Sequence, residues 1–468
     1  MKSTIYCKMG AVILFLLLNI SCEDFVEVEA PDNQLIREQV FSSDITAKSA
    51  MQGIYNQLFQ VSFSNGSRNS VTVLAGLSAD NLENIYTSNL QRMEFQQNEI
   101  LPENEDNLDL WSSAFNMIYM ANSFLEGLED SQNVSPEVAS QLEGEASFIR
   151  AFAYFYLTNI YGDVPLILTT NYKVNEVASR TTQAEVYEQI ISDLSRSREL
   201  LPVEYRDGER YYVNRLTSTA LLARVHLYLQ DWEIAESLST EVINETSLYE
   251  LMEDPNEVFK ANSKEAIWQI SPIGSGGIVT HTNEGGLFII DPFFNFFASL
   301  QLTKDFIDEF QMEDKRRVNW TGYDEGLDAY FPTKYKIDYS TTFPIVEYSM
   351  VLRLAELYLI RAETRVKQGN LNDAVTDINV IRNRAGLNPI PNNNSEVSQE
   401  ELLNIIFTER RKELFTEWGH RWFDLKRNGK ATTILGNDNQ FWQDTDLLYP
   451  IPSEERQKNS NLEQNPGY

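Results

Sequence analysis

Apolar residues recur three and four positions apart along much of the chain, and this spacing predicts a mainly α-helical fold. Residues 44–60 (DITAKSAMQGIYNQLFQ) show the spacing behind a Ser-Ser-Asp run, any member of which could cap a helix. The same pattern predicts helices over 111–128 and 182–201, and helices again over 399–426.

One predicted helix differs from the others because its apolar residues do not keep to one side. Residues 141–161 (QLEGEASFIRAFAYFYLTNIY) are apolar almost all round from Ala146 onward, which is typical of a buried helix. The segment Gly162-Asp163-Val164-Pro165 follows. We expect the helix to end there, since glycine accepts a left-handed stop and proline cannot continue a helix.

Two later segments, 217–243 and 352–386, share the same order of features. In each, an aliphatic helix runs into a short polar turn, and an alanine (Ala235 or Ala374) opens a second helix. This helix-turn-helix pattern is typical of tetratricopeptide-like repeats, in which small residues let paired helices pack closely. Other antiparallel helical pairs can show the same pattern.

The amino-acid composition changes over residues 262–348, between the two helical pairs. Residues 274–286 are rich in glycine, and 291–297 (DPFFNFF) place four phenylalanines in one short stretch. Residues 330–348 have the proline, tyrosine and β-branched content of irregular strands and loops, and the tail after Tyr449 is predicted to be a loop. The predicted fold class is therefore mainly α, a tetratricopeptide-like helical scaffold with an irregular loop-rich portion containing small β-strands.

The N-terminus is arranged as a secretory signal. Two lysines precede an apolar core over residues 11–18, which is too short to span a bilayer because a spanning helix needs about 20 apolar residues. Ser21 then stands directly before Cys22, as at the end of a bacterial lipoprotein signal, although Asn19 replaces the usual Leu or Val. We predict that residues 1–21 form a lipoprotein signal peptide that is removed.

Cysteine content agrees with this interpretation. The chain has two cysteines, and Cys7 lies in the segment that would be removed, so no intramolecular disulfide can form in the mature chain. We predict lipidation at Cys22, where more than one acyl chain is needed for stable anchoring. Residues 22–40 would form an acidic lipidated tether, and 41–468 a single domain that includes the irregular portion.

The charge of the chain excludes one class of partner. Its 468 residues include 69 acidic and 38 basic side chains, for a formal net charge of −31. Such a surface repels phosphate backbones, and no basic stripe laced with aromatic residues offsets it. We therefore expect no nucleic-acid partner.

A series of short motifs runs in order from the buried helix to the last residue. The motifs are 145–151 (EASFIRA) with Tyr154, 162–165 (GDVP), 352–356 (LRLAE), 362–363 (AE), 379–385 (NVIRNRA), 409–414 (ERRKEL), 419–427 (GHRWFDLKR), 449–452 (YPIP) and 464–468 (QNPGY). Together with the Cys22 signal, this series resembles the SusD/RagB family of Bacteroidetes outer-membrane lipoproteins. The resemblance covers the whole chain.

The resemblance implies a location and a partner. It implies a tetratricopeptide-like scaffold carrying the irregular portion, in a protein anchored by lipid to the cell outer membrane and exposed at its surface. It also implies a SusC-like TonB-dependent outer-membrane transporter, on which the mature protein sits as a lid. Members of the family capture glycans, or in some cases peptides, for import.

Candidate catalytic carboxylates are better explained as ion pairs. Glu356 and Glu363 lie on one face of a helix at about 10.5 Å axial separation, from a rise of about 1.5 Å per residue. That exceeds the ~5–9.5 Å expected of paired glycosidase carboxylates. Since Arg353, Arg361 and Arg382 are near in the sequence, we predict structural ion pairing.

Other reactive groups show no catalytic pattern. A second charged cluster at helical spacing, beside two tryptophans, also predicts a packing network: Glu409, Arg410, Arg411, Glu413, Glu417 and Arg421 beside Trp418 and Trp422. His226, His281 and His420 have no metal-ligand spacing, and 274–286 lacks the lysine of a phosphate loop and opens no evident helix. We expect a protein that is not an enzyme and uses no cofactor or metal.

Ligand binding is the remaining class of function, and two loop regions carry the aromatic and polar residues that it requires. Sugar rings place apolar C–H faces against aromatic side chains, while their hydroxyls need polar partners. The candidate residues are Tyr86, Asn89, Gln91 and Arg92 in the first loop, and His281, Asn283, Phe293, Phe294 and Phe296 in the second. The resemblance places both loops where relatives build a binding face, although phenylalanines are usually core residues.

The leading hypothesis is a non-catalytic surface lipoprotein that binds a nutrient, first of all an oligosaccharide, and passes it to a TonB-dependent transporter. One alternative is a peptide-binding member of the same family. A second is a helical-repeat scaffold that binds other proteins, and a third is a glycosidase.

Overall fold

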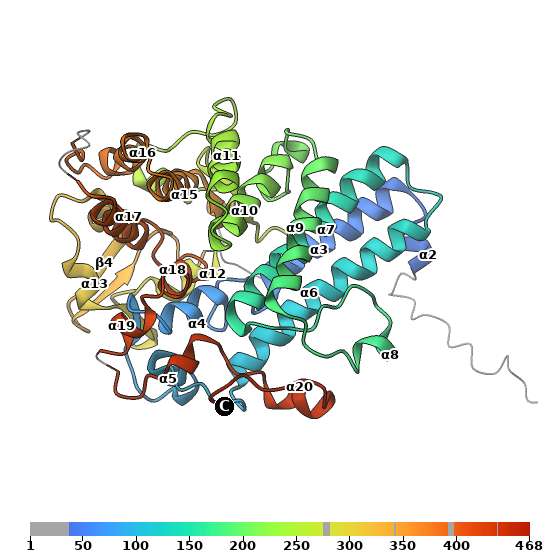
Figure 1. Ribbon diagram of the computed structural model, residues 1–468, viewed down its shortest axis with the longest axis horizontal. Helices are drawn as coiled ribbons and strands as arrows, with labels where there is room; N and C mark the ends of the chain where they lie inside the picture. Colours follow the sequence, from blue (N-terminus) through green and yellow to red (C-terminus); the bar gives the residue numbers. More distant parts are fainter. Residues whose placement is uncertain (1–36, 275–280, 341–342, 392–396, 438) are drawn as a thin grey trace, which may run out of the picture.

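Helices make up most of the computed structural model, which describes residues 37–274, 281–340, 343–391, 397–437 and 439–468 (Figure 1). The strands among them are few and short, so the predicted fold class is confirmed. The predicted signal peptide (1–21), Cys22 and most of the predicted tether (22–40) lie outside the described residues.

The long α-helices alternate with short elements along the chain. The α-helices are α2 (Arg37–Val40), α3 (Asp44–Gln60), α4 (Val71–Leu77), α5 (Leu90–Gln97), α6 (Glu105–Asp130), α7 (Pro136–Tyr161), α8 (Tyr172–Asn175), α9 (Gln183–Leu200), α10 (Arg215–Tyr228), α11 (Trp232–Ile243), α12 (Asn283–Phe288), α13 (Lys304–Asp308), α14 (Lys315–Trp320), α15 (Leu354–Lys367), α16 (Leu371–Arg384), α17 (Gln399–Glu413), α18 (His420–Arg427), α19 (Ala431–Leu435) and α20 (Ser453–Lys458). The 3-10 helices are η2 (Arg206–Gly208), η3 (Pro255–Glu257), η4 (Asn295–Phe297) and η5 (Asp444–Leu447).

Helices α6 and α7 are the longest, with 26 residues each, and both begin earlier than their apolar patterns predict. The Asn104 side chain caps α6, and Pro136 occupies the first turn of α7, where its missing N–H costs nothing. The polar first turns of both helices carry no periodic apolar signal, which explains the difference. Almost every residue over 144–161 is buried, because α6 and α9 pack against α7 (Figure 1).

The two segments with matching patterns are helical pairs, α10 with α11 and α15 with α16. Their turns contain Gln230 and Gly369, both with positive φ. Helix α11 packs against α15, and α17 packs against both α15 and α16, so the pairs form one stack. This confirms the predicted tetratricopeptide-like scaffold.

The C-terminal region contains one difference from the prediction. The predicted loop after Tyr449 includes the short helix α20, which follows Pro452 and carries two acidic residues in its first turn. Carboxylates there favour a helix because the N-terminus carries partial positive charge.

The irregular portion is held by two small antiparallel sheets. The strands are β1 (Leu82–Asn84), β2 (Ala266–Ile270), β3 (Leu300–Leu302), β4 (Thr321–Asp324), β5 (Ala329–Pro332) and β6 (Ser349–Arg353). One sheet has the order β1-β3-β5-β4, and the other pairs β2 with β6. Strand β1 comes from outside the portion predicted as irregular, and it joins that portion to the N-terminal helices.

A buried ion-pair network links the motifs of the C-terminal half. The Arg353 guanidinium lies 2.8 Å from Glu417 and 2.5 Å from Glu413, and it also contacts Glu265. Burial acts to raise the pKa of Glu413, but nearby arginines, Arg384 first, outweigh it and lower that pKa. The predicted packing network over residues 409–421 is thus confirmed.

The predicted ion pairing of Glu356 and Glu363 is also confirmed, with partners other than the expected arginines. Glu356 lies 2.6 Å from Arg224, and Glu363 lies 2.5 Å from Arg427. None of the helices in the described ranges is both long enough and apolar enough to cross a membrane.

Candidate ligand-binding site

The two loops with candidate ligand-binding residues lie side by side. Strand β1 pairs with β3 so that Asn84 faces Leu300, and the pairing continues in a 3.0 Å hydrogen bond from Ile85 N to Ser299 O. Ile85 also packs, with Ile289, against a small apolar cluster around Ile290. The loop that leaves β1 and the loop that enters β3 therefore share one end of the sheet.

A cavity of about 520 Å³ opens beside the second loop. Three segments far apart in the sequence line it: 67–68, 283–298 and 338–339. This volume lies within the range of small-molecule sites. We call it the aromatic cavity, after Phe294 and Tyr339, which both line it.

Glycines in α12 allow the third segment to approach. The Thr282 side chain caps α12 by accepting a hydrogen bond from Gly285 N at 3.0 Å. A Cβ on Gly285 would lie 2.1 Å from the carbonyl oxygen of Ile337, and one on Gly286 would lie 3.3 Å from the Tyr339 ring. The glycine-rich segment thus ends in a short helix, which its sequence did not indicate, and the glycines bring residues 337–339 against that helix.

The phenylalanines of the second loop are exposed rather than buried. Phe293 is 86% exposed, Phe294 57% and Phe296 61%, and the Phe294 and Phe296 rings meet edge to face at 6.2 Å. Asp291 fixes the turn, since its carboxylate accepts from Phe293 N at 2.7 Å. The exposure of these rings is unusual, because phenylalanine is usually buried.

Most polar residues of the first loop support its structure. Asn89 caps α5 by accepting from Arg92 N at 3.0 Å, and Gln91 is half-buried. Arg92 is buried and donates to Ser299 Oγ at 3.2 Å. Burial, together with the nearby Arg68 guanidinium, lowers the pKa of Arg92. Tyr86 is the aromatic residue of this loop that stays exposed, at 44%.

The two polar candidates of the second loop differ in position. Asn283 lines the aromatic cavity and donates to the carbonyl oxygen of Asn65 at 2.8 Å. His281 is buried, and its Nδ1 accepts from Val346 N at 3.1 Å. His281 and Arg92 therefore hold the loops in place and do not line the aromatic cavity, so their contact with a ligand stays a prediction.

Most residues that line the cavity were not predicted, and three of them can contact a ligand through charged or aromatic groups. Arg68 follows α3, and Asp338 and Tyr339 lie in the segment with irregular-strand composition; all three line the cavity. Tyr339 is 71% exposed. The tyrosine and proline content of 330–348 gave a weak signal, but only tertiary contact with α12 shows that Tyr339 belongs to the site.

Glu284, the residue after Asn283 in α12, carries a buried carboxyl group. Glu284 in α12 accepts a hydrogen bond from Ser349 of β6 and packs directly on Gly66. Burial raises the pKa of Glu284 to about 7. This carboxyl group therefore connects α12 to β6 and to the segment that carries Arg68.

The cavity combines aromatic faces with a cationic group, carboxylates and an amide. This combination suits a neutral polar ligand. Within the described ranges, no group of three or more His, Cys, Asp or Glu side chains is placed to hold a metal ion.

Comparison with known proteins gives the relationships of the chain. Residues 24–229 match the family described as "Starch-binding associating with outer membrane", and residues 329–468 match the one described as "SusD family". SusD-like protein P2 of Formosa agariphila is 29% identical, over 98% of this chain and 99% of its own length. Starch-binding protein SusD of Bacteroides thetaiotaomicron is 24% identical, over 73% of this chain and 74% of its own length.

Solved structures show the same fold. A SusD superfamily protein from Bacteroides vulgatus aligns with a TM-score of 0.80 at 20% identity, over 92% of this chain and 100% of that one. Surface glycan-binding protein A from Bacteroides thetaiotaomicron, in complex with laminarihexaose, aligns with a TM-score of 0.77 at 21% identity, over 90% and 99%. The two family matches, the full-length relatives and the shared fold agree with the motif series, and the chain belongs to the SusD/RagB family.

Proposed function

We propose that this protein binds an oligosaccharide in the aromatic cavity and passes it to a TonB-dependent outer-membrane transporter. The observation that carries the proposal is the exposure of Phe294 and Tyr339 at a cavity that polar groups also line, with Phe293 and Phe296 exposed on the same loop as Phe294. Exposing four aromatic rings costs free energy unless a ligand covers them.

The chemistry of the cavity fits a sugar. The Phe294 and Tyr339 rings can cover the C–H faces of pyranose rings. Arg68, Asp291 and Asn283 supply donors and acceptors for hydroxyl groups at the same cavity.

Relatives support the same class of ligand. One relative is named a starch-binding protein, one structural neighbour is titled a laminarin-binding SusD-like protein, and another holds laminarihexaose. Starch and laminarin are both polysaccharides, so these names favour a saccharide over a peptide.

The proposed location follows the family and the N-terminal sequence. The family description associates its members with the outer membrane. We infer that residues 1–21 are removed, that Cys22 is acylated and that 22–40 tether a single domain (41–468) at the cell surface. A SusC-like transporter is the proposed partner, and no catalytic step is assigned, since the carboxylates first considered for catalysis are engaged in buried ion pairs.

Calorimetry on residues 23–468 tests the ligand class. The titrants are laminarihexaose, maltohexaose and a set of peptides of similar mass. Saturable binding of a saccharide supports the proposal, binding of peptides alone would replace it with the peptide-binding alternative, and binding of neither would contradict it. For the partner, recovery of a large β-barrel transporter with the tagged protein from outer membranes is expected; recovery of other proteins alone would favour the scaffold alternative.

A further inference from the structure

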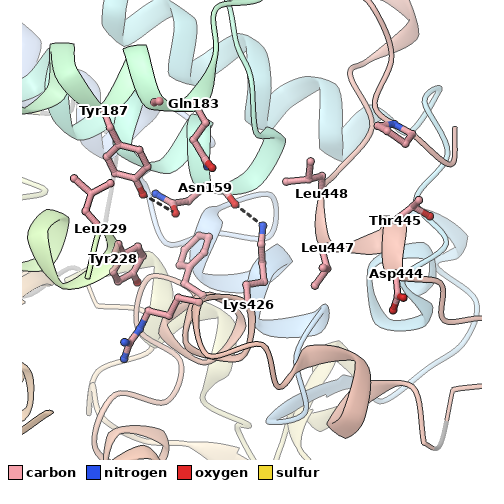
Figure 2. Close-up of a pocket in the computed structure, with 14 residues that line it drawn as sticks. Asn159, Gln183, Tyr187, Tyr228, Leu229, Lys426, Asp444, Thr445, Leu447 and Leu448 are labelled. Carbon is pink, nitrogen blue, oxygen red and sulfur yellow. Dashed lines mark hydrogen bonds between the residues drawn. The ribbon is translucent and has the colours of Figure 1, made fainter. Parts of the chain in front are cut away.

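A second and larger cavity, of about 640 Å³, lies at the junction of α7, α9, α10, α18 and the C-terminal segment (Figure 2). It shares no lining residue with the aromatic cavity. We call it the Lys426 cavity, because the Lys426 side chain extends from α18 into it toward Asn159.

The walls of the Lys426 cavity are mainly aromatic and aliphatic. Tyr187, Tyr228 and Phe423 supply rings, and Leu447 and Leu448 face them from the C-terminal segment (Figure 2). The Tyr228 and Phe423 rings lie 6.5 Å apart and are tilted by 52°. Phe423 is buried, whereas Tyr228 is partly exposed. Such walls fit the flat faces of a ring compound.

Lys426 differs from its cationic neighbours because it has no carboxylate partner. Arg427 pairs with Glu363 and Asp424, and Arg410 also pairs with Asp424. By contrast, no carboxylate of the described ranges lies within 4.0 Å of Lys426 Nζ, which donates to Asn159 O at 2.5 Å. It also lies 5.6 Å from the centre of the Trp422 ring. Isolated charge of this kind is costly to bury.

The groups that face Lys426 leave its charge uncompensated. Burial raises the pKa values of Tyr187 and Tyr228, so both phenols stay neutral, and Tyr187 donates to Asn159 Oδ1 at 3.0 Å. Asp444 is exposed at the rim, where it accepts from Thr432 Oγ1 at 2.8 Å. Burial alone lowers the pKa of Lys426 to about 7.

We propose that the Lys426 cavity binds a ring compound bearing one carboxylate, with the carboxylate on Lys426 Nζ and the ring against Tyr228 and Leu448. A carboxylate would complete an ion pair that the fold leaves open, and the walls would cover the body of the ligand. Two sources share this chemistry: a uronic acid unit of an acidic saccharide and a small aromatic acid.

Proton uptake gives the test a signature that is specific to Lys426. Above pH 7 the free amine is largely neutral, whereas a bound carboxylate requires the ammonium form. Binding should therefore take up close to one proton at pH 8. Affinity should fall about tenfold between pH 6 and pH 8, since the protonated fraction of a group with a pKa near 7 falls by that factor.

The experiment is calorimetry on residues 23–468 with D-glucuronate and with benzoate, in two buffers of different ionisation enthalpy. Glucose and benzyl alcohol are the neutral controls and should bind at least tenfold more weakly than the acids. K426M should abolish binding, and K426R should bind without proton uptake because arginine stays charged. K430M is the matched control, since Lys430 contacts Asn404 outside the cavity, and it should bind as the unmodified protein does.

Each outcome decides the proposal. Binding of glucuronate alone assigns the site to acidic saccharides, binding of benzoate alone assigns it to aromatic acids, and either result supports it. The proposal would be overturned if the neutral controls bound as tightly as the acids, or if K426M bound the acids as tightly as the unmodified protein. It would also be overturned if neither acid bound at millimolar concentration. Should K426M unfold, the pH dependence and proton uptake of the unmodified protein still decide. F294A should leave this binding unchanged, which separates it from the aromatic cavity.

Discussion

Ile85 donates its backbone N–H to the carbonyl oxygen of Ser299 at 3.0 Å, across 214 positions of the chain (299 − 85). This bond extends the β1–β3 ladder by one residue and sets the two loops beside each other. The candidate ligand-binding site is therefore a composite of the N-terminal part and the irregular portion.

The aromatic cavity should lose saccharide affinity when its rings are removed. Each of F294A and Y339A should weaken binding of the saccharide found by calorimetry by about 2- to 10-fold, the value of one aromatic contact. Neither should lower the melting temperature by more than a few degrees, because both side chains are exposed. Tyr172 on α8 is 66% exposed and lines neither cavity, so Y172A is the control. Unchanged affinity in F294A and Y339A would place the ligand elsewhere.

Gly285 should be required for the close approach of residues 337–339 to α12. G285A would set a Cβ 2.1 Å from Ile337 O, so either the helix or the segment must move. We expect a loss of roughly 1–3 kcal/mol in the free energy of unfolding, as for other overpacked sites, and weaker saccharide binding.

Gly53 provides the matched glycine control. It lies in the middle of α3, and a Cβ there would have no atom within 4 Å. G53A should stabilise the protein by about 0.5–1 kcal/mol, because alanine loses less backbone freedom on folding. Urea denaturation measures both variants, and equal effects of the two substitutions would rule out the steric explanation.

Arg353 should be critical for stability. R353M would remove the one buried cation of the described ranges that pairs with all three of Glu413, Glu417 and Glu265, which costs about 3–5 kcal/mol. Arg196 forms exposed ion pairs with Glu143 and Glu199, so R196M should change the free energy of unfolding by less than about 1 kcal/mol. A small effect of R353M in urea denaturation would contradict the structural role of the network.

Glu284 should make stability depend on pH. Its pKa is about 7 in the folded protein against an ordinary value of 4.5, so the folded state holds the proton longer. The contribution of this group to the free energy of unfolding is fully present below pH 4.5. It is lost as the pH rises to 7, and the loss amounts to up to about 3 kcal/mol.

The variant E284Q removes that titration and keeps a polar group for Ser349. The free energy of unfolding of E284Q, relative to that of the unmodified protein, should increase between pH 4.5 and 7. Above pH 7 the difference should stay constant, and urea denaturation at several pH values measures it. E250Q, at an exposed position, should keep the original pH dependence. A constant difference between E284Q and the unmodified protein would show that Glu284 does not titrate in this range.

Lipidation should depend on Cys22 alone. In the native host, C22A should abolish incorporation of labelled palmitate and move the protein out of the membrane fraction, because acylation is its proposed anchor. C7A changes only the segment predicted to be removed, so its product should stay at the membrane. Membrane attachment of the C22A protein would contradict the proposed anchor.

The scaffold could be predicted from the sequence because helical spacing is a local signal. Residues 44–60 were predicted to the residue, and the paired helices were recognised from Ala235 and Ala374. The early starts of α6 and α7 could not be predicted, since their first turns are polar.

The candidate site was predicted only in part, for a physical reason. The exposed phenylalanines were found from composition, but sequence alone does not show that Arg92 and His281 point into the fold. Tyr339 could not be predicted because its approach depends on glycines in α12, and Arg68 could not because only tertiary contact brings its segment to the cavity.

The phenylalanine-rich loop begins at α12 and ends at β3, and both anchors belong to the folded framework, whereas its rings lie outside the core. Its length and composition can therefore change without disturbing the scaffold. Transplanting residues 291–297 from a relative, with the packed residues Ile289, Ile290 and Ala298 kept, is thus a route to altered ligand preference on an unchanged helical scaffold.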